Sequence, residues 1–236
     1  MNDIPENEIN SQAAADAESG ITEGAKNEGF NLGKEIFEWI YTLVIALAIA
    51  FVIKGFIFDV VRVDGPSMES TLINNDRLII TKLGYTPHSQ DIIILDSNYK
   101  AREKYYDALE MSGQKVNAIS KTIDYFSLPA NLKKRYYVKR IIGLPGQTVD
   151  IVDGRVLVDG EVLDEPYLDS GLITSATDSS VNYPITVSED CVFVMGDNRP
   201  HSKDSRSSDL GEVPIDAILG KAQIRIWPLN SIGLTK

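Results

Sequence analysis

The chain has 236 residues, of which 43% are hydrophobic and 24% are charged, and these proportions suit one medium globular domain or two small ones. Its net charge of −11 argues against a nucleic acid partner, because nucleic acid binding rewards basic surfaces. The single cysteine, Cys191, excludes an intramolecular disulfide, and with only two histidines besides it we expect neither a metal site nor another cofactor.

The first 35 residues are strongly acidic and almost free of aromatic side chains. They hold eight carboxylates against two lysines, so a charge of −6 is concentrated there. Such a segment buries too little apolar surface to offset the entropy lost on ordering. We therefore predict a disordered acidic tail over residues 1–35.

A long apolar run follows, with twenty residues from Trp39 to Phe58 that include one charge, Lys54. A helix rises about 1.5 Å per residue, so this length matches a hydrocarbon core roughly 30 Å thick. We predict a transmembrane anchor over residues 36–58. The alternatives are a buried core helix and a cleavable signal peptide, although the run is long for the latter and no small residues follow it. The few flanking lysines and arginines leave the orientation open.

Residues 59–236 change to short β-branched runs separated by turn residues, which is typical of a mainly β domain with little helix. Asp153-Gly154 and Asp159-Gly160 are turn signals that indicate hairpins. Asp59–Asp64 alternates weakly, and the clearer predicted strands or hairpins cover Asp76–Lys82, Asp91–Leu95, Tyr136–Ile142, Val149–Leu163, Ile185–Val187, Cys191–Met195 and Lys221–Trp227.

One segment, residues 96–137, interrupts this pattern with two predicted short helices, Tyr99–Met111 and Lys115–Phe126. Residues 99–138 hold eight basic and four acidic side chains, a charge of +4 in an otherwise acidic chain. Basic residues interleaved with aromatic ones suggest an arm that touches anionic lipid. The alternative is an ordinary solvated insertion.

Ser67 lies a few residues after the apolar run, in the sequence Val-Asp-Gly-Pro-Ser-Met-Glu over residues 63–69. Glycine and proline favour a tight turn there, which would hold the hydroxyl near the bilayer. A serine hydroxyl becomes a good nucleophile only when a base takes its proton. Ser67 is a candidate nucleophile, and a helix cap is the alternative.

Three residues could supply that base: His88, His201 and Lys139. In a strand over residues 137–143, Lys139 and Arg140 face opposite sides, and the pattern does not tell which side is buried. Arginine keeps its proton, whereas a buried lysine can lose it. Lowering a lysine pKa from about 10.4 to about 8 costs roughly 3 kcal/mol, which an apolar pocket can impose. Lys139 is thus a candidate base, and a surface cation is the alternative.

A third stretch, residues 195–209, is a dense polar run directly after an apolar strand. It is either an ordinary loop or a network of Asp, Arg and hydroxyl groups able to orient an ammonium.

Three blocks in this order resemble the bacterial type I signal peptidases (leader peptidases), and the resemblance runs from the anchor to the C-terminus. They are Gly-Pro-Ser-Met at 65–68, Tyr-Val-Lys-Arg-Ile-Ile-Gly-Leu-Pro-Gly at 137–146, and Met-Gly-Asp-Asn-Arg at 195–199 with Ser-Lys-Asp-Ser-Arg at 202–206. The resemblance implies a signal-peptidase-like β domain of short mixed strands. It also implies a single-pass protein of the cell membrane, with a cytoplasmic tail and an extracytoplasmic catalytic domain over 59–236.

The activity that this resemblance implies is that of a membrane-bound serine endopeptidase, a hydrolase that removes N-terminal signal peptides from exported preproteins during protein secretion. Cleavage would follow small residues at −1 and −3, with the substrate bound as an extended strand beside a sheet edge. Ser67 would attack the scissile carbonyl to form an acyl-enzyme, and Lys139 would take its proton. Ser202 would orient Lys139.

The remaining matched positions are supporting ones. Asp204 and Arg206 match a structural ion pair beneath the site, Gly196 matches a residue packed close to it, and Met68 matches a residue that lines the cleft and binds substrate.

Five positions depart from the family pattern. Gly65 stands where some relatives carry a serine whose hydroxyl helps to hold the oxyanion, so the Ser67 backbone N–H would carry more of that role. Ser70 replaces a usual proline, Gln147 a usual aspartate, and Pro200-His201 a usual polar pair.

Two other functions compete with this one. A self-cleaving repressor-type Ser–Lys protease shares the chemistry, but such a regulator needs no bilayer. A non-catalytic membrane-tethered module that binds exported chains would need no nucleophile.

Overall fold

The computed structural model describes residues 32–235, so most of the predicted acidic tail lies outside the described residues. The chain divides into two compact units that meet between Ala48 and Ile49. Helix α2 (Leu32–Val52) continues into a π-helical turn, η1 (Ile53–Ile57). Together they form the one helix of the described chain that is long and apolar enough to cross a membrane, with a mean hydropathy of 2.4. It begins four residues before the predicted anchor, and all of its α-helical residues are exposed, unlike those of a core helix.

The second unit is mainly β, and every strand pair among its described residues is antiparallel rather than mixed. Its main sheet has the order β1-β2-β11-β3-β4-β9-β10, with β12 paired to β11. The strands of this sheet are β1 (Phe58–Arg62), β2 (Arg77–Thr81), β3 (Ile92–Asp96), β4 (Tyr136–Gly143), β9 (Cys191–Met195), β10 (Val213–Pro214), β11 (Ile218–Trp227) and β12 (Gly233–Leu234).

A smaller sheet has the order β7-β6-β5-β8. Its strands are β5 (Thr148–Val152), β6 (Arg155–Val158), β7 (Glu161–Val162) and β8 (Ile185–Thr186). The two predicted hairpin turns are present, because Asp153, Gly154, Asp159 and Gly160 all have positive φ. The predicted strands are confirmed, because each predicted range overlaps a strand of one of the two sheets. The two-residue strands β10 and β12 were missed because they are too short to show a pattern.

Three apolar clusters hold this unit together. One joins Leu78 and Ile80 of β2 to Met68 and Leu72, and a second lies around Ile93 of β3. The third packs the smaller sheet against β4 and β9. β4 thus runs between the main sheet and the smaller one, and its residues are buried from Lys139 to Gly143.

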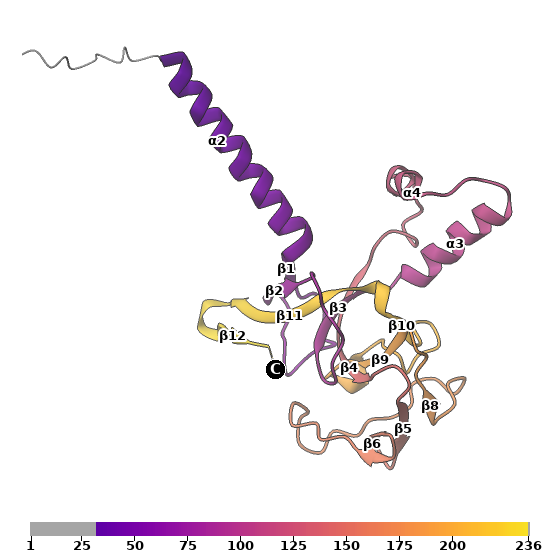
Figure 1. Cartoon of the computed structure of the whole chain (residues 1–236). Helices are drawn as coiled ribbons and strands as arrows, with labels where there is room; N and C mark the ends of the chain where they lie inside the picture. Colours follow the sequence, from indigo (N-terminus) through magenta and orange to yellow (C-terminus); the bar gives the residue numbers. More distant parts are fainter. Residues whose placement is uncertain (1–31, 236) are drawn as a thin grey trace, which may run out of the picture. The chain divides into compact units, whose positions relative to one another are not determined.

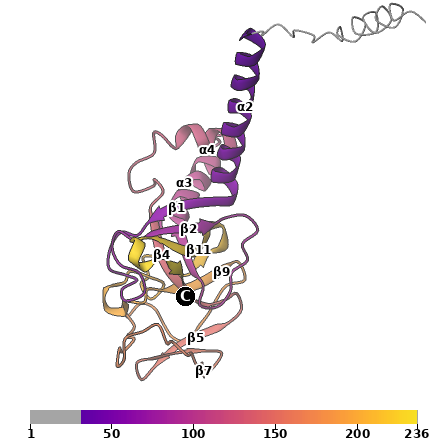
Figure 2. The same ribbon diagram turned by 90° about the vertical axis from the view of Figure 1, so that its left-hand side faces the viewer.

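The insertion lies at one end of this unit, and the smaller sheet lies at the other (Figures 1 and 2). The helices of the insertion are α3 (Tyr99–Met111), which has the predicted bounds, and α4 (Ala118–Asp124), which is shorter than predicted. A small cluster of Tyr106, Leu128 and Leu132 holds the insertion together, so it has a core of its own. The predicted lipid contact of this segment stays a prediction.

Candidate active site

Ser67 sits in a tight turn between β1 and β2. The turn needs glycine at its start, because Gly65 has a φ of +100°, which other residues rarely adopt. Glu69 N donates to Pro66 O at 3.1 Å and closes the turn. Met68, only 1% exposed, anchors it in the core beside Leu72. Met68 is absent from the residues lining the cleft at Ser67, and its predicted contact with substrate stays a prediction.

The loop after β9 supports this turn from behind. Asn198 N donates to Ser67 O at 3.1 Å, and Asn198 Nδ2 donates to Pro66 O at 3.0 Å. Gly196 lies so close that a Cβ there would be 2.4 Å from Ser67 O and 2.3 Å from Ser202 Oγ. The close packing predicted for Gly196 is therefore present.

Lys139 comes from β4, where it pairs with Ile93 of β3. Its side chain is buried, and its Nζ lies 2.7 Å from Ser67 Oγ and 3.0 Å from Val138 O. Burial lowers the pKa of Lys139 from 10.5 to about 8, although the charges of Asp204 and Asp197 act to raise it. The structure thus brings the candidate nucleophile into contact with a lysine that is readily neutral.

Arg140 is as buried as Lys139, although the two side chains leave the strand on opposite sides. Its guanidinium binds both carboxylate oxygens of Asp197, at 2.9 and 2.7 Å, and lies 3.7 Å above the ring of Tyr167. Asp197 also accepts a hydrogen bond from Thr71 Oγ1 at 2.6 Å. Sequence reasoning missed this arginine–aspartate pair, which ties β4 to the loop behind Ser67.

The predicted ion pair between Asp204 and Arg206 is present and buried, with a closest distance of 2.8 Å. Asp204 also accepts a hydrogen bond from Gly196 N at 3.0 Å, so the pair fixes the loop that supports the turn. Ser202 Oγ is buried and has no hydrogen-bond partner among the described residues. It therefore makes no hydrogen bond to Lys139 here, and its predicted role as orienter stays a prediction.

The other two candidate bases lie elsewhere. His88 faces solvent near Asp91, at 3.6 Å, and His201 is exposed at the end of a 3-10 turn. Neither lines the small cleft at Ser67, which has a volume of about 60 Å³. That cleft is lined by Val61, Arg62, Val63, Asp64, Ser67, Tyr136, Tyr137, Val138 and Lys139. Within residues 32–235, no three histidine, cysteine or carboxylate side chains gather as metal ligands would.

A serine hydroxyl in contact with a buried lysine, at the end of a small cleft, is the geometry of a serine hydrolase that uses lysine as its base. The family described as signal peptidase, peptidase S26, matches residues 36–227. The chain belongs to this signal peptidase family.

Relatives with this name come from several bacteria. Signal peptidase I P of Bacillus subtilis subsp. natto is 33% identical over 84% of this chain and 92% of its own length. Signal peptidase I of Leptolyngbya laminosa is 33% identical over 84% of this chain and 83% of its own. Signal peptidase I S of Bacillus subtilis strain 168 is 31% identical over 89% of this chain and 99% of its own.

Proposed function

We propose that Ser67 is the nucleophile and Lys139 the general base with which this signal peptidase cleaves exported preproteins. The observation that carries the proposal is the 2.7 Å contact between Lys139 Nζ and Ser67 Oγ in a buried setting. The lysine can accept a proton because burial brings its pKa to about 8.

The reaction proceeds in two steps. Neutral Lys139 takes the proton of Ser67 Oγ as that oxygen attacks the scissile carbonyl carbon, and the lysine then gives the proton to the departing amine. The mature protein leaves, and the signal peptide remains bound to Ser67 as an ester. Lys139 next takes a proton from a water molecule, whose oxygen attacks the ester carbonyl carbon. The lysine returns that proton to Ser67 Oγ as the ester bond breaks, and the signal peptide leaves with a free carboxylate.

The oxyanion of each tetrahedral intermediate is held by backbone. Ser67 N has no hydrogen-bond partner among residues 32–235, so it is free to donate to that oxygen. Gly65 contributes no hydroxyl, and Ser67 thus supplies both the nucleophile and a stabilising donor.

Two unpaired strand edges favour an extended substrate. β1 is the edge strand of the main sheet, with β2 as its neighbour on one side. β9 pairs with β4 only from Arg140 onward, so the first half of β4 lacks a partner on that side in the described chain. The cleft lies between these edges, residues 61–64 and 136–139, where a peptide strand could hydrogen-bond to backbone. Its volume of about 60 Å³ suits small side chains at −1 and −3.

Cleavage of a preprotein with an Ala-x-Ala site tests the proposal. We expect Ser67→Ala and Lys139→Ala to abolish cleavage, while Ser170→Ala and Lys133→Ala, which change exposed residues of the same types, leave it intact. Full activity in either dyad variant would refute the mechanism. Far-ultraviolet circular dichroism checks that each variant is folded.

We further propose that the catalytic unit rests on the bilayer, with the tail cytoplasmic and the β domain on the other side. An apolar cavity of about 850 Å³ lies within this unit, between the end of η1, β1 and β11. Large apolar side chains are exposed on the same strands and just beyond them, namely Phe58, Val60, Trp227, Leu229, Ile232 and Leu234. Such a surface in water would be costly, and lipid would cover it.

The two tryptophans of the chain allow a direct test. In the Trp39→Phe variant only Trp227 emits, and brominated lipids should quench it if the domain touches the bilayer. In the Trp227→Phe variant the anchor residue Trp39 reports membrane insertion as a control. If Trp39 is quenched in its variant but Trp227 is not quenched in the other, the surface of the β domain lies in water and this proposal is refuted.

A further inference from the structure

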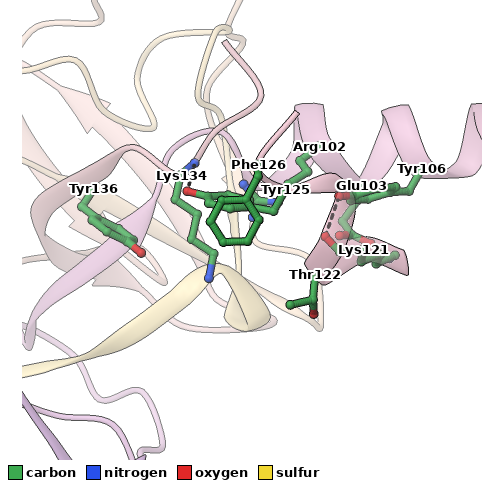
Figure 3. Close-up of a pocket in the computed structure, with 9 residues that line it drawn as sticks. All are labelled: Arg102, Glu103, Tyr106, Lys121, Thr122, Tyr125, Phe126, Lys134 and Tyr136. Atoms are coloured by element: carbon green, nitrogen blue, oxygen red, sulfur yellow. Dashed lines mark hydrogen bonds and ion pairs between the residues drawn. The ribbon is translucent and has the colours of Figure 1, made fainter. Parts of the chain in front are cut away.

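The insertion forms a pocket of about 500 Å³ between α3, α4 and the start of β4 (Figure 3). The lining side chains include three cations and one carboxylate. They are Arg102, Glu103, Tyr106, Lys121, Thr122, Tyr125, Phe126, Lys134 and Tyr136.

Most of the charge in this pocket is already neutralised. Arg102 pairs with Asp96 at 2.5 Å, and Lys121 pairs with Glu103 at 2.9 Å. Lys134 differs, because its Nζ has neither a hydrogen bond nor an ion pair within residues 32–235. One uncompensated positive charge therefore remains.

Two phenol hydroxyls accompany this charge. Figure 3 shows Lys134 between Tyr136 on one side and Tyr125 with Phe126 on the other. Tyr125 Oη accepts a hydrogen bond from Lys134 N at 3.3 Å, so its own proton can be donated elsewhere. Burial raises the pKa of Tyr136, which keeps that hydroxyl protonated. An ammonium and two O–H donors that line the same pocket suit a carboxylate.

The pocket adjoins the catalytic cleft at Tyr136, the one residue among those described that lines both. Tyr136 precedes Lys139 by three residues on β4, which is about 10 Å along a strand that rises about 3.3 Å per residue. A substrate strand beside β4 would thus place its third residue from the scissile bond at Tyr136, and the next residues at the pocket.

The direction of that strand follows from the apolar helix. The cleft extends from Ser67 back along the end of β1 as far as Val61, and β1 itself begins at Phe58, directly after η1. In a preprotein the apolar segment precedes the cleavage site and is the part held by the membrane. Residues upstream of the scissile bond therefore lie toward the start of β1 and toward Tyr136.

We propose that this pocket binds an acidic side chain of the preprotein, four to six residues before the scissile bond. The proposal rests on the proposed function and adds to it a preference for sequence outside the −1 and −3 positions. Lys134 is the residue that sets this preference, with Tyr125 and Tyr136 as additional donors.

The test uses the full chain in a neutral detergent and three preproteins that differ only at −5, with Glu, Gln or Lys. We expect kcat/KM to favour Glu over Lys about threefold to fivefold, a difference typical of a partly exposed charge pair, and to lose this preference at high salt. Lys134→Glu should invert the order. Lys133→Glu changes the neighbouring exposed lysine, which does not line the pocket, and should keep both the wild-type order and the wild-type rates.

An unchanged order in Lys134→Glu would overturn the proposal. The proposal would also be refuted if Lys134→Glu lowered cleavage in vesicles with anionic phospholipid but not in detergent. That result would show that the partner of Lys134 is a lipid headgroup. A wild-type chain that cleaves none of the three preproteins would instead refute the proposed function, and the pocket assignment with it.

Discussion

The pH dependence of cleavage tests the role of Lys139 most directly. Only the neutral amine can act as a base, and a pKa of about 8 makes about one tenth of it neutral at pH 7 and about nine tenths at pH 9. We therefore expect kcat/KM to rise about tenfold between these pH values and then to level off. An exposed lysine with a pKa of 10.5 would give about a hundredfold rise over the same range, with no plateau by pH 9.

The assay is single-site cleavage of one preprotein from pH 6 to pH 10, followed by gel or mass spectrometry. Lys133→Ala, which changes an exposed lysine, serves as the control for general effects of pH on the chain and should give the wild-type profile. A profile that levels off below pH 7 would show that a group with a lower pKa, such as a histidine, is the base. A profile still rising tenfold per pH unit above pH 9 would show that Lys139 is not desolvated, and the reasoning from its burial would be refuted.

Four further outcomes follow from the same site. Lys139→Met should abolish cleavage yet raise the free energy of unfolding at pH 7 by up to about 3 kcal/mol, as measured by urea unfolding. The pKa of Lys139 is lower in the folded chain than in the unfolded one, so this gain in stability should shrink as the pH rises from 8 to 10.5. Asp197→Asn leaves Arg140 buried without its charge partner, and urea unfolding should show a loss of about 3–5 kcal/mol. Gly196→Ala pushes a methyl group against the backbone of the Ser67 turn, so kcat should fall about a hundredfold, and an unchanged kcat would contradict the close packing. His201→Ala should keep most activity, whereas a loss of several hundredfold would favour a histidine base.

The strands and the long apolar helix were predictable because their signals are local. Asp153-Gly154 and Asp159-Gly160 marked turns correctly, since the left-handed conformation they adopt depends on the residue type itself. The bounds of α3 were likewise readable from the chain. Strands β10 and β12 were not, because two residues carry no periodicity and are ordered by their neighbours.

The site was only partly predictable for a related reason. A strand pattern predicts that one face is buried, and so Lys139 and Arg140 looked like alternatives. The structure buries both, because each finds a partner from a distant segment, Ser67 for the lysine and Asp197 for the arginine. These partners lie 72 and 57 residues away along the chain, so the sequence around Lys139 and Arg140 does not indicate them.

The two buried basic residues, Arg140 and Lys139, have different electrostatic environments, and the proposed chemistry depends on that contrast. Arg140 is charged, and the bidentate pair with Asp197 compensates it while fastening β4 to the loop behind Ser67. Among the residues that the structure describes, no carboxylate makes a hydrogen bond to Lys139; Asp204 is paired with Arg206, and Asp197 is paired with Arg140. The charges of Asp204 and Asp197 act to raise the pKa of Lys139, whereas the charge of Arg206 acts to lower it. The ion pair of Arg206 with Asp204 therefore supports the proposed base indirectly, because the arginine offsets part of the negative charge that favours a protonated Lys139.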